Sequence, residues 1–176
     1  DVHREPLDGR QLLVGHALVP ELGARIEARR DVLLFTSKSL EEPLEVTGRV
    51  RMVAWLAAET PDTDLVVRLC DVHPDGRSFH VCDGILRLRF RDGGGEARLM
   101  APGEVYRVEV DLWSTAQVFL PGHRLRLQVR ASDFPRYDRC PGTGQNSGEA
   151  DRVMPQRNRL FHDPERPSHL VLPVIV

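Results

Sequence analysis

Strict alternation of apolar and charged residues in segment 105–112 constrains this fold more than any other feature of the chain. The apolar residues on one side are Tyr106, Val108, Val110 and Leu112, and the charged residues between them are Arg107, Glu109 and Asp111. A period of two places the two sets on opposite faces of a β-strand. The segment therefore predicts a strand with one face in a core and the other outside it.

The same alternation recurs in two other segments, 86–91 and 124–131. Their predicted inward residues are Leu86, Leu88, Phe90, Leu125, Leu127, Val129 and Ala131, and their outward residues include Arg87, Arg89, Arg91, Arg124, Arg126 and Arg130. The outward arginines predict a solvated sheet face or an interdomain salt-bridge surface. Segments 50–58 and 65–72 are apolar on both sides, which is typical of central strands. Shorter candidate strands are 32–35, 79–82, 159–162 and 170–175.

Turns rich in glycine and proline separate these strands, and no long stretch has the 3.6-residue period of a helix. Eight or nine short strands predict an all-β fold, an antiparallel jelly-roll β-sandwich with little helix, over residues 31–176. Residues 1–30 are predicted as a lead-in or linker with at most one helical turn, because Pro20 and Gly23 interrupt its apolar run. Its apolar residues are expected to form a docking surface that favours self-association, while packing on the chain's own sandwich and a passive linker stay open. These residues are Leu12, Leu13, Val14, Leu18, Val19 and Leu22.

Charge and composition argue against several classes of partner. The 24 Lys and Arg against 26 Asp and Glu give a net charge of −2, with no basic footprint for nucleic acid. No apolar run reaches the roughly 18–20 residues of a membrane span. Three cysteines indicate buried thiols in a reducing compartment, so we expect a cytoplasmic protein; a Cys70–Cys82 bridge stays open. The start at Asp1, without a signal-peptide pattern, predicts a piece of a larger protein.

The chain shows no recognisable catalytic or cofactor-binding motif. The nucleophile elbow G-x-S-x-G is absent, and segment 142–147 (GTGQNS) misses both that motif and G-x-G-x-x-G. The seven histidines include no His-x-His pair, although a cluster formed only in the folded chain stays open. Asp62-Thr63-Asp64 lacks the glycine and terminal glutamate of a calcium loop. We therefore assign no catalytic, cofactor-binding or metal residue.

Two further features bear on binding. Aromatic residues on which a sugar could stack are scarce, since Trp55 and Trp113 both fall in strands predicted to be buried. The irregular stretch from Phe134 to Pro155 is longer than an ordinary loop, which indicates a functional segment or an interdomain contact.

Several ordered segments together resemble the C-terminal, non-catalytic domain of the X-Pro dipeptidyl-peptidase and cocaine-esterase-like serine hydrolases. They are 31–37, 44–48, 61–64, 69–77 (LCDVHPDGR), 83–87, 121–126, 132–139 (SDFPRYDR), 162–164 and 167–173. The resemblance covers 31–176 and implies a galactose-binding-like jelly roll. It also implies a partner, the α/β-hydrolase domain that supplies a Ser–Asp–His triad. That domain is absent from this sequence, so no triad residue is carried over.

In such a protein the sandwich is expected to pack on the catalytic domain, and loops at one end of it to wall the substrate pocket. The candidate hydrolase-facing loops are 71–77 and 134–139, with His73, Pro74, Asp75, Arg77, Phe134, Arg136 and Tyr137. Three alternatives stay open. The loops can be turns without a partner, or the chain can be a carbohydrate-binding jelly-roll module or a metal-dependent β-sandwich enzyme.

Overall fold

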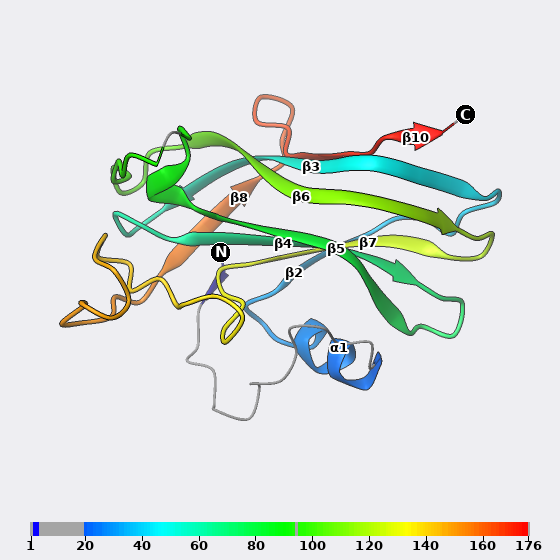
Figure 1. Ribbon diagram of the computed structural model, residues 1–176, viewed down its shortest axis with the longest axis horizontal. Helices are drawn as coiled ribbons and strands as arrows, with labels where there is room; N and C mark the ends of the chain where they lie inside the picture. The colour runs from blue at the N-terminus through cyan, green and yellow to red at the C-terminus, as the bar shows by residue number, and fades with distance from the viewer. Residues whose placement is uncertain (1, 4–19, 94, 176) are drawn as a thin grey trace.

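Long amphipathic strands pair into two antiparallel sheets that face each other across an apolar core (Figure 1). The computed structural model describes residues 2–3, 20–93 and 95–175, and ten strands lie within them. Sheet A contains β1 (Val2–His3), β3 (Leu44–Ala58), β6 (Tyr106–Phe119), β8 (Arg157–Phe161), β9 (His169–Val171) and β10 (Val174–Ile175). Sheet B contains β2 (Leu33–Thr36), β4 (Asp64–Val72), β5 (Ser78–Arg87) and β7 (Arg124–Arg130). The predicted antiparallel jelly-roll sandwich is confirmed.

The alternating strands turn their apolar faces toward the space between the sheets. In the β3–β6 pair, Met52 lies opposite Val110 and Ala54 opposite Val108, and all four are buried. Sheet B contributes Leu69 of β4, which is fully buried. Burial of each such large side chain stabilises the fold by about 1.5–3 kcal/mol. The core therefore lies where the period of two predicts it.

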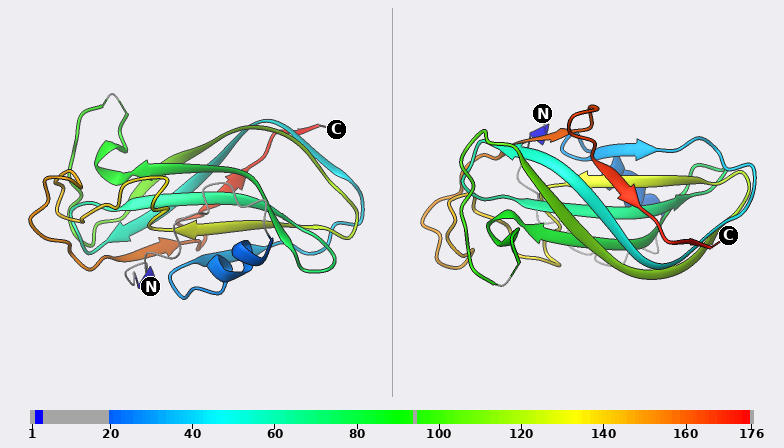
Figure 2. Two further views of the ribbon diagram at one scale, coloured as in Figure 1. Left: turned by 60° about the horizontal axis from the view of Figure 1, so that its bottom comes forward. Right: turned by 90° about the horizontal axis from the view of Figure 1, so that it is seen from above.

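The sandwich is closed at one edge and open at the other (Figure 2). At the closed edge β5 lies against β6, and a Cβ atom on Gly84 would stand 2.0 Å from the carbonyl oxygen of Asp111. Only glycine allows the two strands to approach this closely. At the open edge, β2 of sheet B faces β8 and β9 of sheet A, and a cavity remains between the sheets.

The strand predicted over 86–91 ends early. β5 gives way to a 3-10 turn, η2 (Leu88–Phe90). The Leu88 N–H donates to the carbonyl oxygen of Thr63 at 2.9 Å, and the Leu88 side chain is fully buried. The hydrogen bond to the neighbouring loop thus favours a turn here, although the local alternation predicts a strand.

The prediction that Trp113 is buried is wrong. β6 contains one residue more than β3 at this point, because Arg49 pairs with Ser114 whereas Arg51 pairs with Asp111. The extra residue makes a β-bulge, in which Trp113 takes a φ of 67°. Its side chain lies outside the core, and the residue is 68% exposed.

The outer face of sheet B is covered by the chain itself. Helix α1 (Pro20–Glu27) has eight residues, where at most one turn was predicted, and it contacts β5. Glu27 accepts hydrogen bonds from Arg126 and Gln128 of β7. Arg130 and Arg89, predicted to point outward, are only 6% and 5% exposed.

The apolar docking residues predicted in the lead-in lie outside what the structure describes; they are Leu12, Leu13, Val14, Leu18, Val19 and the side chain of Leu22.

The three cysteines are free and buried, so Cys70 and Cys82 are not bridged. Burial raises the pKa of the Cys70 thiol to about 11, and those of Cys82 and Cys140 to about 12. The thiols therefore stay protonated at neutral pH.

In the described part of the chain, no helix is long and apolar enough to cross a membrane.

Candidate functional site

The first predicted loop is the tight turn between β4 and β5. The His73 N–H donates to the Arg77 carbonyl oxygen at 2.9 Å, and the Gly76 N–H donates to the His73 carbonyl oxygen at 2.9 Å. The Arg77 guanidinium binds the Asp75 carboxylate at 2.6 Å. Hydrogen bonds from the backbone and side chain of Arg77 lower the pKa of Asp75. Local bonds thus fix the turn, while Pro74, Asp75 and Arg77 remain exposed.

Beside this turn, two histidines converge on Asp71 near the end of β4. His123 Nδ1 lies 2.9 Å from Asp71 Oδ1, and His73 Nε2 lies 3.8 Å from Asp71 Oδ2. The two imidazole rings contact each other with centroids 4.3 Å apart and planes tilted by 41°, and the His73 ring also contacts the Phe79 ring, with centroids 4.4 Å apart. Potential ligand atoms of Asp71, His73 and His123 all lie within 4.8 Å of one another.

Residue spacing gave no sign of this cluster, because His73 and His123 belong to different turns. One carboxylate and two imidazoles are a donor set that also occurs in zinc sites. Here the hydrogen bond between His123 and the buried Asp71 carboxylate already explains the arrangement, since a buried carboxylate requires partners. The pair ties the β6–β7 turn to the end of β4.

The second predicted loop, 134–139, is held on the outer face of sheet B by buried charges. We call them the Arg68–Asp83 network; its members are Arg68, His80, Asp83, Arg130, Asp133 and Arg136. The Arg68 guanidinium lies 3.3 Å from the Asp83 carboxylate and 3.6 Å from that of Asp133. Arg136 binds Asp83, and Arg130 binds Asp133. The side chains of Arg68 and Asp83 are 5% and 6% exposed, so the contact between these two groups forms away from water.

Opposing effects act on the pKa of the Asp83 carboxyl. Burial alone would raise that pKa, but hydrogen bonds from His80 and Arg136 and the charge of Arg68 lower it well below its ordinary value. The carboxylate therefore stays ionised and anchors the loop at neutral pH.

At the tip of the second loop, each arginine covers an aromatic ring. The guanidinium of Arg136 lies 5.2 Å from the ring centre of Tyr137, and that of Arg139 lies 4.5 Å from that of Phe134. Such cation–π contacts restrict the side chains as well as the backbone. The tip thus presents Arg136 and Tyr137 in a defined arrangement.

The two predicted loops leave opposite ends of sheet B (Figure 1). The β4–β5 turn follows Val72, which pairs with Arg124 at the start of β7. The second loop follows the end of β7, where Arg130 pairs with Val66 near the start of β4. The expectation that both loops belong to one end of the sandwich is therefore wrong.

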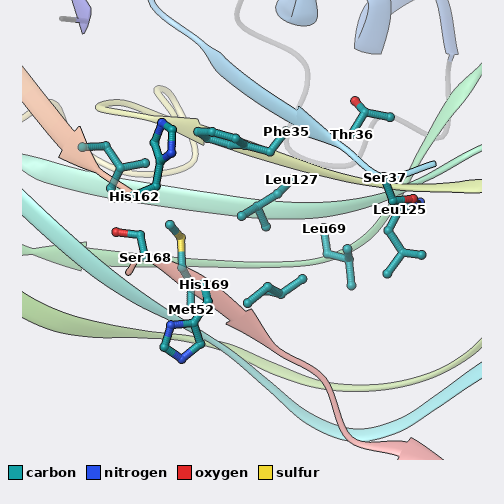
Figure 3. A pocket seen from close by; sticks show the side chains of 12 residues that line it. Phe35, Thr36, Ser37, Met52, Leu69, Leu125, Leu127, His162, Ser168 and His169 are labelled. Carbon is teal, nitrogen blue, oxygen red and sulfur yellow. Dashed lines mark hydrogen bonds between the residues drawn. The ribbon is translucent and has the colours of Figure 1, made fainter. Parts of the chain in front are cut away.

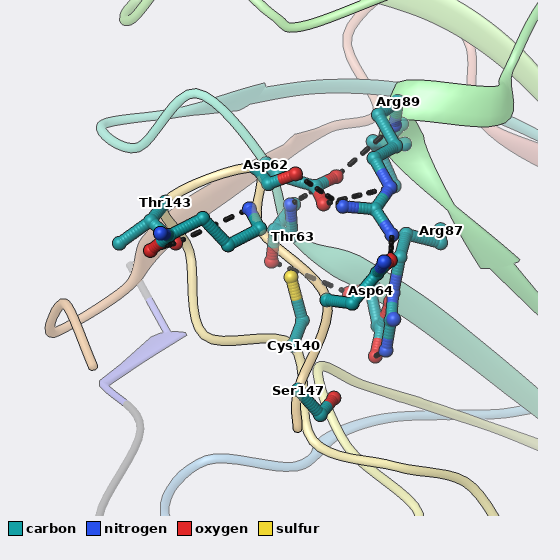
Figure 4. A network of polar contacts seen from close by, with 12 residues as sticks. Asp62, Thr63, Asp64, Arg87, Arg89, Cys140, Thr143 and Ser147 are labelled. Carbon is teal, nitrogen blue, oxygen red and sulfur yellow. Dashed lines mark hydrogen bonds and ion pairs between the residues drawn. The ribbon is translucent and has the colours of Figure 1, made fainter. Parts of the chain in front are cut away.

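A second polar network packs the rest of the long irregular stretch against the β3–β4 turn (Figure 4). The Asp62 carboxylate accepts the backbone N–H groups of Thr63 at 3.0 Å and Arg89 at 3.1 Å. The Arg89 guanidinium donates to the carbonyl oxygen of Gly144 and, at 2.7 Å, to the side-chain oxygen of Asn146. The glycine-rich segment is thus held in place by a buried arginine.

Neighbouring contacts complete this network. The Arg87 guanidinium binds the Asp64 carboxylate at 2.8 and 3.1 Å, and this hydrogen bonding raises the pKa of Arg87. The Gln156 amide donates to the Cys140 carbonyl oxygen at 2.7 Å and accepts from the Thr63 hydroxyl at 2.8 Å. These carboxylates and amides serve the packing of the chain, because their partners are protein groups.

At the open edge of the sandwich lies an apolar cavity of about 500 Å³ (Figure 3). Half-buried Leu125 and Leu127 line it, although the alternation predicted both in a filled core. Ser168 lies near His162 and His169 in its wall, but the Ser168 hydroxyl donates to the Phe161 carbonyl oxygen and accepts the Trp55 N–H at 2.8 Å. A hydroxyl that bonds two backbone groups in this way has a structural role and is not an activated nucleophile.

Comparison with known proteins identifies the family of this chain. The family model described as the X-Pro dipeptidyl-peptidase C-terminal non-catalytic domain matches residues 2–171. The chain belongs to this family. It is 42% identical to a cocaine esterase of Rhodococcus sp. (strain MB1 Bresler) over 152 residues, which are 85% of this chain and 26% of that protein.

Two solved structures share the fold. An aminopeptidase from a marine sediment Thaumarchaeota archaeon superposes with a TM-score of 0.83 at 30% identity, covering 86% of this chain and 27% of that one. An α-amino acid ester hydrolase gives a TM-score of 0.83 at 31% identity, covering 86% of this chain and 26% of that one. The chain thus spans about a quarter of the length of these relatives. The family is the non-catalytic C-terminal domain of such hydrolases.

Proposed function

We propose that this chain is the accessory C-terminal domain of a longer serine hydrolase of the X-Pro dipeptidyl-peptidase or cocaine-esterase type. In this proposal it packs on an α/β-hydrolase catalytic domain. That domain supplies the Ser–Asp–His triad and transfers an acyl group from an ester or amide to water. The match of the non-catalytic family model to residues 2–171 is the observation that carries the proposal. Most of the length of each relative lies outside the matched part, which leaves room for such a partner.

We further propose that the 71–77 and 134–139 loops face the catalytic domain and that the second of them walls its substrate pocket. Arg136 and Tyr137 stand on a loop whose backbone is held by the Arg68–Asp83 network. A substrate group that meets them finds them already ordered, and preordered contacts lose little entropy on binding.

In the same proposal, residues 31–176 form the sandwich domain, and residues 1–30 are a lead-in that adds the short strand β1 (Val2–His3) to sheet A. The hydrogen bonds of Glu27 support an arrangement in which the end of the lead-in rests on β7. The three free, buried thiols are compatible with a reducing, cytoplasmic compartment.

A carbohydrate-binding module is the alternative function, and the exposed indole of Trp113 is the observation that favours it. Titration calorimetry of the isolated chain with neutral oligosaccharides separates the two functions. The accessory-domain proposal expects no heat of binding. A saturable heat that Trp113→Ala abolishes would favour the module instead.

The coding sequence upstream of Asp1 provides the first test of the accessory-domain proposal. It should encode a G-x-S-x-G elbow followed by an Asp and then a His. The protein that includes this upstream region should hydrolyse X-Pro anilides or aryl esters, and the isolated 176 residues should not. Tyr137→Ala in the longer protein should raise KM or lower kcat, with the exposed residue change Val153→Ala as the control. An upstream region without a triad would contradict the proposal.

A further inference from the structure

Trp113 occupies a backbone conformation that a bulky residue rarely adopts. Its φ of 67° lies in the left-handed region, where the Cβ atom of a non-glycine residue is crowded. The bulge is held by Asp111, whose carboxylate accepts the Trp113 N–H at 3.1 Å and the Arg49 Nε–H at 2.9 Å. Glycine would suit this backbone better, yet the position carries the largest side chain and leaves it exposed.

The indole is one of four exposed apolar side chains on or beside the outer face of sheet A, with polar residues such as Ser114 and Glu45 between them. We call these four residues the apolar strip; they are Trp113, Val118, Leu120 and Ile175. The register places Val118 and Ile175 on either side of Glu45, so all three point outward. Val118, Ile175 and Leu120 are 45%, 52% and 51% exposed. Exposed apolar side chains gathered on one face in this way form a candidate interaction surface.

The strip continues to the first predicted loop. Leu120 begins the β6–β7 turn, in which Gly122 lies against Pro74. His123 of the same turn binds Asp71 beside the β4–β5 turn. The surface thus runs along β6 from Trp113 to the 73–77 turn at one end of the sandwich, far from the 134–139 loop (Figure 1).

Nothing in the described part of the chain covers this strip. Seen from above, β3, β6 and β10 lie toward the viewer, whereas α1 lies on the opposite side of the sandwich (Figure 2). The chain therefore supplies a cover for the outer face of sheet B and none, within its described residues, for the strip on sheet A.

We infer that Trp113 anchors the docking of the catalytic domain, through a surface formed by Trp113, Val118, Leu120, Ile175 and the 73–77 turn. This inference rests on the proposed function and makes it more specific, because it names the surface that holds the catalytic domain, while the 134–139 loop reaches that domain from the other end of the sandwich. Tryptophan is the residue type that most often dominates an interface when it enters an apolar pocket of the partner. A bulge next to an ion pair projects such a side chain well beyond the plane of the sheet.

The occupant follows from two observations. The chain matches about a quarter of each relative, and its family is a C-terminal domain. In the proposed function, the catalytic domain therefore precedes this chain in the same polypeptide. A partner joined in this way is present at high effective concentration, and a small apolar surface is enough to hold it. A second copy of this chain is the competing occupant, and the experiment below separates the two.

The test uses the longer protein with a specific protease site placed just before Asp1. After cleavage, analytical ultracentrifugation measures the dissociation constant of the two parts. Trp113→Ala should raise it at least about 30-fold, the effect of losing a hot-spot side chain. Val153→Ala, at an exposed apolar residue outside the strip, should leave it unchanged.

The isolated chain gives an independent readout. Trp113→Gly removes the exposed side chain and relieves the crowded backbone, so its melting temperature should equal or exceed that of the wild type. The same variant should weaken docking in the cleaved protein. Opposite effects of one substitution would show that the bulge serves the partner and not the stability of the domain.

The remaining outcomes overturn one idea or the other. If the wild-type parts stay together and the Trp113 variants do so equally well, the anchor is wrong and the proposed function stands. If the wild-type parts separate freely, the proposed function itself fails. If Trp113 instead drives dimerisation of the isolated chain and does not affect docking, the occupant is a second copy and the inference is overturned.

Discussion

The two outer faces of the sandwich differ in how far the chain itself covers them. On sheet B, α1 and the 134–139 loop cover the strands, and the buried charges beneath them are paired. On sheet A, the ion pair of Arg51 and Glu109 lies in solvent, with side chains 45% and 42% exposed. Beside it, Trp113 is left uncovered in a strained bulge.

The difference separates the parts of the chain that stabilise the domain from the face that leaves charged and apolar side chains exposed. Removing one member of a buried charge network leaves its partners unpaired and is destabilising. The outer face of sheet B therefore contributes to the stability of the domain itself. Exposed ion pairs contribute little, and an exposed indole contributes nothing to the core. The outer face of sheet A is therefore free to be used for binding.

The largest expected effect lies within the Arg68–Asp83 network. Asp83→Asn should lower the free energy of unfolding by about 3–5 kcal/mol, because Arg68 and Arg136 lose their shared carboxylate inside the protein. Urea unfolding followed by circular dichroism measures the change. Asp75→Asn, in the exposed β4–β5 turn, is the matched control and should leave the midpoint unchanged.

The same network gives a pH dependence with a defined sign. Folding lowers the pKa of Asp83 below its ordinary value of 3.8, so its stabilising effect is present above that pH and is lost as the pH falls below it. The wild type should lose stability more steeply than Asp83→Asn as the pH falls from about 4 to about 2, below the ordinary pKa of the carboxyl. Parallel curves for the two proteins would mean that Asp83 is not held as an anion.

A smaller effect is expected where α1 meets sheet B. Glu27→Ala should destabilise the chain by about 1–2 kcal/mol, because the polar groups of Arg126 and Gln128 lose their acceptor in a half-buried site. It should also increase hydrogen exchange in β7. A change too small to measure would show that α1 is not part of the cover and would weaken the contrast between the faces.

The smallest effect belongs to the outer face of sheet A. Arg51→Ala should change the free energy of unfolding by less than about 0.5 kcal/mol, since its ion pair with Glu109 is exposed. Chemical denaturation under the conditions used for Asp83→Asn allows a direct comparison. A loss of more than about 2 kcal/mol is well beyond the range for exposed pairs and would remove the distinction between the covered face of sheet B and the exposed face of sheet A.

The sequence predicted the features that depend on local periodicity. The alternation in 105–112 and 124–131 located β6 and β7, and the resemblance in ordered segments identified the family. The single extra residue at Trp113 defeated the same rule, because a bulge changes the phase of the alternation without changing the composition.

The features that depend on distant contacts were not predictable. Arg130 appeared outward by alternation, but it is buried because the chain folds back over the outer face of sheet B. The Asp71 cluster joins histidines from two turns, and the cavity arises where the two sheets separate. In each case the cause is the packing of segments far apart in the chain, which a period of two does not report.

Hydrogen–deuterium exchange tests the central claim most directly, by comparing the isolated chain with the longer protein that contains the catalytic domain. If the outer face of sheet A is the docking face, peptides spanning 111–120 and 73–77 should exchange more slowly in the longer protein. Peptides from the self-covered outer face of sheet B, such as those spanning 64–70, should exchange equally in both. Equal exchange at 111–120 and 73–77 in the two proteins would contradict the account, because the docking face would then lie elsewhere on the sandwich.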